Sequence, residues 1–133
     1  MKPLVWVHAD SLSRASAPFR MYPDAPAVFV LDTEGMQADE ASIGRAMFLY
    51  QSAMELPCEL RRGDTTSEVL WTARARGCDS IVTLDSPDPE FRRVCEELRK
   101  SLRVDVLPAT AALEIDVRQF KGFWKASASF DLV

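Results

Sequence analysis

The chain has 133 residues, of which 47% are hydrophobic and 27% are charged, and this composition is typical of one globular domain. Sixteen Lys and Arg against twenty Asp and Glu give a formal net charge of −4, which argues against a dedicated nucleic-acid-binding domain. No apolar run reaches the ~20 residues of a membrane helix, and the first apolar run is too short for a signal peptide. The three cysteines are far apart and outside any CxxC pair, which favours a reducing compartment, so we expect a cytoplasmic protein.

Apolar runs typical of strands alternate with helical patterns along the chain. Residues 4–7 and 27–31 are continuous apolar runs, as expected for strands covered on both faces. Residues 11–26, between them, have no clear period and predict a long loop, with or without one helical turn. Residues 39–56 predict the first helix, because apolar side chains recur every three or four residues and would form its buried face: Ile43, Ala46, Met47, Tyr50, Ala53 and Met54.

The second half of the chain continues the alternation. Further strands are predicted at residues 58–61, 80–84 and 104–107, with the first of these closest to a sheet edge. Two helices separate them. Thr65 and Glu68 have the spacing of a capping box at the start of one helix. The sequence Asp88-Pro89-Glu90 favours the start of the other, whose buried face would hold Phe91, Val94, Cys95 and Leu98.

Five strands joined by crossover helices predict a single-domain, doubly wound α/β fold, with a five-stranded parallel sheet and helices on both faces. Residues 1–108 would form this domain. Residues 109–133 predict a C-terminal extension that packs on the domain or on a partner, because this short segment contains four aromatic side chains: Phe120, Phe123, Trp124 and Phe130.

Several segments, in this order, resemble the N-terminal α/β domain of the DNA photolyase and cryptochrome family. Residues 4–10 (LVWVHAD) and 27–32 (AVFVLD) are similar to its first two strands, and residues 61–64 (RRGD) are similar to its third strand and the following turn. Residues 88–93 (DPEFRR) are similar to its acidic segment with proline at a helix start. The resemblance covers roughly residues 3–108. It implies the strand order 3-2-1-4-5 and an antenna ligand, which in this family is a folate, a deazaflavin or a flavin mononucleotide.

The predicted site lies at one edge of the sheet. In open parallel sheets, ligands bind at the carboxyl ends of the strands where the strand order reverses, which here is between the first and fourth strands. The residues near this edge form the predicted ligand-binding set: His8, Ala9, Asp10, Arg14, Asp32, Gly63, Asp64, Asp85, Ser86 and Asp88. Capping and turn formation explain most of these acids equally well, and a histidine at a strand end is more often hydrogen-bonded than a ligand. No glycine-rich phosphate-binding motif is present.

The family's flavin-binding helical domain is far longer than these 133 residues, so neither bound FAD nor photolyase catalysis is expected. We therefore expect a non-catalytic binding or interaction module that accepts a flavin-, folate- or nucleotide-like ligand at the cleft. The alternative is a protein–protein module that self-associates, or binds a separate partner, through the aromatic C-terminal segment. A third hypothesis is a metal-dependent enzyme that acts on phosphoesters or nucleotides through Asp10 and Asp85, although no dedicated metal site is predicted. Direct binding to nucleic acid or to a membrane is not expected.

Overall fold

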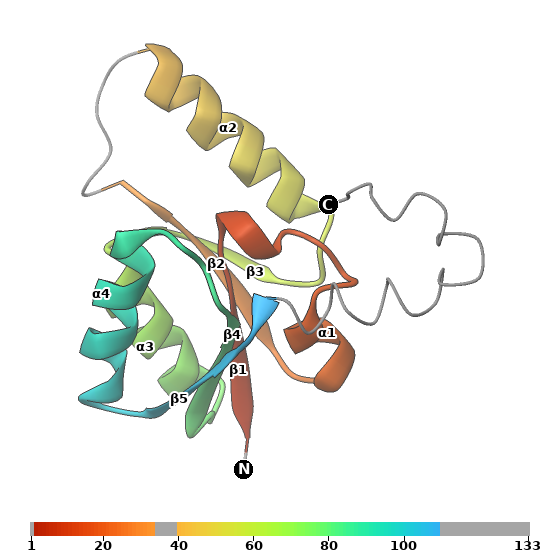
Figure 1. Cartoon of the computed structure of the whole chain (residues 1–133), viewed down its shortest axis with the longest axis vertical. Coiled ribbons are helices and arrows are strands. Elements are labelled where there is room, and N and C mark those ends of the chain that lie inside the picture. The colour runs from red at the N-terminus through yellow and green to blue at the C-terminus, as the bar shows by residue number, and fades with distance from the viewer. Residues whose placement is uncertain (1, 34–39, 110–133) are drawn as a thin grey trace, which may run out of the picture.

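The protein forms one sheet of five parallel strands in the order β3-β2-β1-β4-β5, with helices on both faces (Figure 1). The structure is a computed structural model, and it describes residues 2–33 and 40–109. The predicted α/β class and strand order are confirmed. In chain order the elements are β1 (Pro3–Val7), the 3₁₀-helix η1 (Ala9–Ser11), α1 (Ala17–Met21), β2 (Ala27–Asp32), α2 (Glu40–Met54), β3 (Glu59–Gly63), α3 (Thr65–Ala75), β4 (Ser80–Leu84), α4 (Pro89–Arg99) and β5 (Arg103–Leu107).

The face covered by α3 and α4 holds the larger hydrophobic core. Successive side chains of a strand point to opposite faces, so Leu4 and Trp6 of β1 lie in this core while Val5 and Val7 lie on the other face. The two helices contribute buried apolar side chains: Val69, Ala73, Phe91, Val94, Cys95 and Leu98. The buried face predicted for the helix after Asp88 is therefore confirmed.

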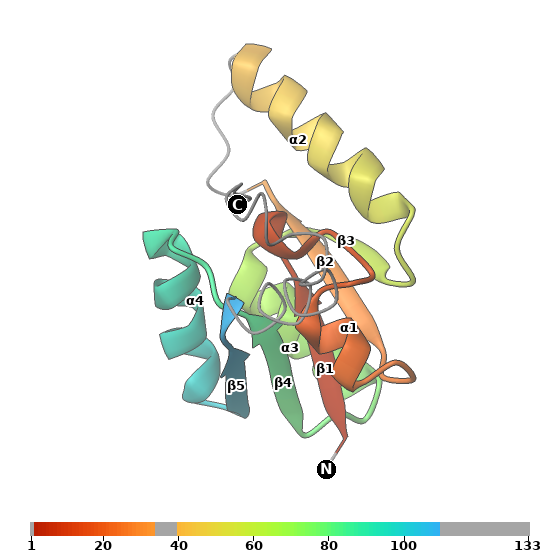
Figure 2. The same ribbon diagram turned by 45° about the vertical axis from the view of Figure 1, so that its right-hand side comes forward.

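The opposite face is covered by α1 and α2, and its core is smaller. Among the described residues, Ala53 is the only buried side chain that a helix contributes to this cluster, while Phe19, Leu49 and Tyr50 pack against it half-buried. In both ribbon views α2 lies apart from α3 and α4 and runs along the outside of the sheet (Figures 1 and 2).

The buried face predicted for α2 is wrong in part. The structure buries Ala46 and Ala53 but leaves Ile43, Met47 and Met54 exposed. The periodicity correctly indicates an amphipathic helix, yet α2 contacts the fold through the alanine side of its apolar stripe. A repeat of three and four residues does not say which edge of a wide stripe faces the sheet, because both edges belong to the same apolar surface.

The helix starts follow local capping, with one correction. Asp88 caps α4 as predicted, since its Oδ1 accepts a hydrogen bond from the Glu90 amide at 3.0 Å. At α3, the predicted capping box of Thr65 and Glu68 is wrong. Asp64 is the cap and accepts from the Ser67 amide at 3.0 Å, while Glu68 pairs with Arg61 of the neighbouring strand β3. A carboxylate one position earlier competes successfully for the amide donors of the first turn.

Two further segments bear on the predictions. The region predicted as a long loop, residues 11–26, contains the last residue of η1 and all of α1. Of the predicted C-terminal extension, only Ala109 is among the described residues, so its four aromatic side chains, Phe120, Phe123, Trp124 and Phe130, lie outside them. Within residues 2–33 and 40–109, no helix has the length and apolar character needed to span a bilayer.

Candidate functional site

A cleft of about 700 Å³ opens at the carboxyl ends of β1 and β2, and its lining extends to the segment after β4. From β1 the chain winds outward to β2 and β3, and from β4 it winds the other way to β5, so the strand order reverses between β1 and β4. This is the position at which open α/β sheets bind their ligands. The volume lies within the range of about 300–1,000 Å³ that is typical of small-molecule sites.

Three rings form one wall of the cleft. Trp6 and Phe91 are stacked, with ring centroids 5.4 Å apart and an interplanar angle of 11°. The imidazole of His8 meets both rings edge-on, at centroid distances of 5.5 Å from Trp6 and 5.1 Å from Phe91. Val30 and Val94 also line the cleft. This part of the surface is apolar and aromatic, which suits a planar ring system.

His8 is held by both of its ring nitrogens. Nδ1 accepts a hydrogen bond from the Asp10 amide at 3.2 Å, so the ring proton is on Nε2, which donates to the Leu84 carbonyl at 2.6 Å. Burial lowers the pKa of His8 below its usual value, although the hydrogen bond to Leu84 and the nearby carboxylates act in the opposite direction. The imidazole is therefore a neutral group that joins the end of β1 to the end of β4.

The segments that follow β1 and β4 are joined by a small polar network at the rim. Ser86 Oγ donates to Asp10 Oδ2 at 2.5 Å and accepts from the Asp88 amide at 3.2 Å. The Asp88 carboxylate in turn accepts from the Glu90 amide at the start of α4. These contacts fix the shape of the cleft on its β4 side.

The charged side chains that line the cleft are mostly carboxylates, and the wall formed by α2 and β2 contributes Asp32 and Arg45. Asp32, at the end of β2, accepts a hydrogen bond from Thr65 Oγ1 at 3.4 Å. Arg45 of α2 is the only Lys or Arg among the described residues that line the cleft, whereas four carboxylates line it: Asp10, Asp32, Asp88 and Glu90. The electrostatic potential in the cleft is therefore unfavourable for a ligand with several negative charges.

The structure brings together six residues of the predicted ligand-binding set, all of which line the cleft: His8, Ala9, Asp10, Asp32, Ser86 and Asp88. The other four do not line it. Asp64 caps α3, Asp85 accepts a hydrogen bond from the Ser86 amide, and Gly63 lies at the end of β3 with a φ of +137°. Arg14 is exposed in the turn between η1 and α1.

Sequence reasoning missed the aromatic wall and the contribution of α2. Trp6 lies in a predicted buried strand and Phe91 on a predicted buried helix face; both are buried, and both also line the cleft. Their positions could have indicated this, because Trp6 is next to the last residue of β1 and Phe91 is in the first turn of α4, and both of these ends lie at the cleft. The place of Arg45 in the cleft could not be predicted from the sequence, because a helical repeat does not show which polar residue faces a strand end far away in the chain.

The three cysteines do not belong to the cleft. Cys78 and Cys95 are buried and Cys58 is half-buried, and all three are free thiols. Burial raises the pKa of Cys58 and of Cys95 to about 11, so both are protonated, weak nucleophiles near neutral pH.

No metal centre is evident in the described part of the chain, where no group of three or more His, Cys, Asp or Glu side chains is arranged to hold an ion. A scan against protein-family models gives no match, and no curated protein matches the sequence.

Proposed function

We propose that this chain is a non-catalytic binding module that takes a flavin- or nucleotide-like ligand in the cleft at the strand-order reversal. One observation carries the proposal: a cleft of about 700 Å³ with an aromatic wall lies where open parallel sheets bind ligands. The planar ring of the ligand would lie against Trp6, His8 and Phe91. The resemblance of the sequence to the photolyase α/β domain supports the same ligand class.

The charges of the cleft favour one part of such a ligand over another. The carboxylates of Asp10, Asp32 and Asp88 are hydrogen-bond acceptors, so they suit ring N–H groups and sugar or ribityl hydroxyls. Among the described lining residues, a phosphate would meet these carboxylates and one cation, Arg45. We therefore expect the ring and hydroxyl groups to lie inside the cleft, and any phosphate to point out of it.

The polar groups around the cleft support a binding role rather than catalysis. Both ring nitrogens of His8, the only histidine of the chain, are used in hydrogen bonds: Nε2 joins β1 to the end of β4, and Nδ1 binds the nearby amide of Asp10. The Asp88 carboxylate caps α4, and Asp10 is bonded to Ser86. These hydrogen bonds position the walls of the cleft.

Thermal unfolding with paired ligands tests the proposal. Riboflavin and adenosine are compared with their monophosphates and with folate, each at millimolar concentration. A ligand present at 100 times its dissociation constant stabilises the folded state by about 2.7 kcal/mol, which is readily seen as a rise in Tm. We expect at least one pair to raise the Tm, and the form without phosphate to raise it more. No rise with any of the five ligands would contradict the proposal.

A matched pair of variants tests whether the ligand binds in the cleft. Ala9 and Ala15 are both exposed, but only Ala9 lines the cleft. Ala9→Trp should block the cleft and abolish the ligand-dependent rise in Tm, while Ala15→Trp should leave it unchanged. An equal loss in both variants, or in neither, would mean that the ligand binds elsewhere.

A further inference from the structure

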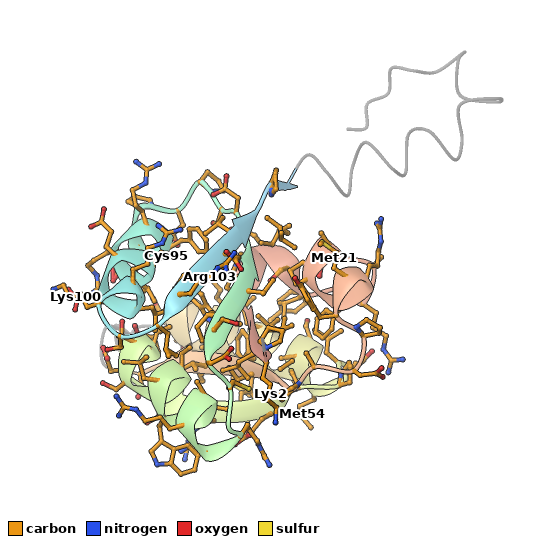
Figure 3. All side chains as sticks on the ribbon, turned by 90° about the horizontal axis from the view of Figure 1, so that it is seen from below. Lys2, Met21, Met54, Cys95, Lys100 and Arg103 are labelled. Atoms are coloured by element: carbon orange, nitrogen blue, oxygen red, sulfur yellow. The ribbon has the colours of Figure 1, made fainter. Side chains whose placement is uncertain are left out.

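Helix α2 carries apolar side chains that the described residues leave uncovered. The exposed fractions are 42% for Ile43, 58% for Met47 and 61% for Met54, and Tyr50 beside them is half-buried. Figure 3 labels Met54 on a different side of the molecule from Cys95 of α4. Side chains of this size are usually covered when they form a continuous surface, so the stripe indicates a contact that the described residues do not make.

The spacing of the stripe indicates what kind of contact this is. Ile43, Met47, Tyr50 and Met54 follow one another at intervals of four, three and four residues. This is the repeat by which one helix packs lengthwise against another, because it returns apolar side chains to the same line on the helix surface. Phe48 is 66% exposed but lies off this line. The surface therefore suits a second helix of similar length.

The same chain contains a segment with the matching repeat. Leu113, Val117, Phe120 and Trp124 also follow at intervals of four, three and four residues. Gly122 within this segment lowers the intrinsic stability of a helix, so such a helix would need a partner surface to form. Phe130 lies outside the repeat.

The connection is long enough for the segment to reach α2. The last strand ends at Leu107, and the described chain ends at Ala109. The six residue steps from Leu107 to Leu113 span roughly 20 Å when extended, whereas β5 and β2, the strand against which α2 packs, are three strand spacings or about 14 Å apart. Residues on the same chain also meet at a high effective concentration, which favours this segment over a separate molecule.

We propose that residues 113–124 bind along the exposed stripe of α2 as a helix, and thereby cover Ile43, Met47 and Met54. The contact is intramolecular and apolar, and it is independent of whether a ligand occupies the cleft. It gives the aromatic C-terminal segment a partner within its own domain.

Hydrogen exchange on the full chain tests the proposal. We compare the wild type with the double variant Phe120→Glu/Trp124→Glu, which places charges in the middle of the contact. Amides of α2 should exchange at least about tenfold faster in the variant, because the covering helix is lost. Amides of α4, on the opposite face of the sheet, should be unchanged, which shows that the domain stays folded. Phe130→Glu is the matched control and should leave α2 unchanged.

Three outcomes would overturn the proposal. Unchanged exchange of α2 in the double variant means that the segment does not cover it. An equal effect of Phe130→Glu means that the effect is not specific to the repeat. A dimer mass for the wild type by light scattering, reduced to a monomer by Met47→Glu, means that a second copy of the chain covers α2.

Discussion

The two faces of the sheet differ in how much of their helices they bury. On one face, α3 and α4 place six buried apolar side chains against the sheet, and both helices begin with an aspartate cap. On the other face, α2 contributes a single buried alanine to the cluster and leaves Ile43, Met47, Phe48 and Met54 exposed. The difference indicates a division of roles: the α3/α4 face supplies the stability of the domain, and the α1/α2 face supplies surface.

The cleft lies where the two faces meet. Its aromatic wall belongs to the α3/α4 core, and its opposite wall comes from α2 and the end of β2. A rigid wall thus faces a wall that is held by fewer contacts. Binding sites commonly combine a rigid part with a part of lower local stability. The comparison of the two faces can be tested by substitutions of the same type on each side.

The largest expected difference comes from truncating one leucine on each face. Leu98 of α4 is completely buried, and Leu49 of α2 is half-buried. Leu98→Ala should lower the free energy of unfolding by about 2–5 kcal/mol, because it leaves a cavity in a well-packed core. Leu49→Ala should lower it by about 1 kcal/mol, since only part of the side chain leaves water on folding. Urea unfolding measures both, and equal losses would show that α2 is packed as tightly as α4.

A smaller effect is expected at the cap of α3. Asp64 accepts hydrogen bonds from both the amide and the hydroxyl of Ser67. Asp64→Ala should lower the free energy of unfolding by about 0.5–2 kcal/mol, whereas Asp64→Asn, which keeps the capping oxygen, should cost much less. Ligand binding should be unchanged in both, because Asp64 does not line the cleft. A loss of binding without a loss of stability would make Asp64 a ligand residue, as the sequence first indicated.

The α3/α4 face was also the more predictable of the two. Continuous apolar runs predicted β1 and β2, and capping residues predicted the start of α4, because these signals depend on neighbours within a few residues. The buried edge of α2 and the cleft role of Arg45 depend on how the helix lies on the sheet, which a local pattern does not contain. Of the acidic residues predicted near the strand ends, Asp10, Asp32 and Asp88 line the cleft, whereas Asp64 and Asp85 do not.

Glycine substitutions compare the local backbone stability of α2 with that of the end of α3. Gly44 lies within α2, where an added Cβ meets nothing within 4 Å, while Gly77 follows α3 with a φ of +69°. Gly44→Ala should raise the free energy of unfolding by up to about 1 kcal/mol, because alanine restricts the unfolded chain and favours the helix. Gly77→Ala should lower it by about 1 kcal/mol, because a Cβ disfavours the left-handed conformation. No gain at Gly44 would show that α2 unfolds separately from the sheet.

The smallest effect is the protonation of His8, which reports on the wall shared by the cleft and the α3/α4 core. Because burial lowers the pKa of His8 in the folded state, the unfolded chain binds a proton first as the pH falls below about 6.5. The free energy of unfolding should therefore decrease from pH 7.5 to 5.5 and level off below the folded-state pKa. His8 is the only histidine, so one imidazole resonance in an NMR titration gives its pKa directly.

The variant His8→Gln provides the control for that measurement. Its stability should be nearly independent of pH between 7.5 and 5.5, because aspartate and glutamate side chains normally titrate near pH 4. A measured pKa at or above 6.5 would mean that Leu84 and the carboxylates of Asp10, Asp88 and Asp85 outweigh burial. The wall would then be more exposed to water and more polar than its three rings indicate. The positive charge of the protonated imidazole would also repel a ligand with a cationic ring.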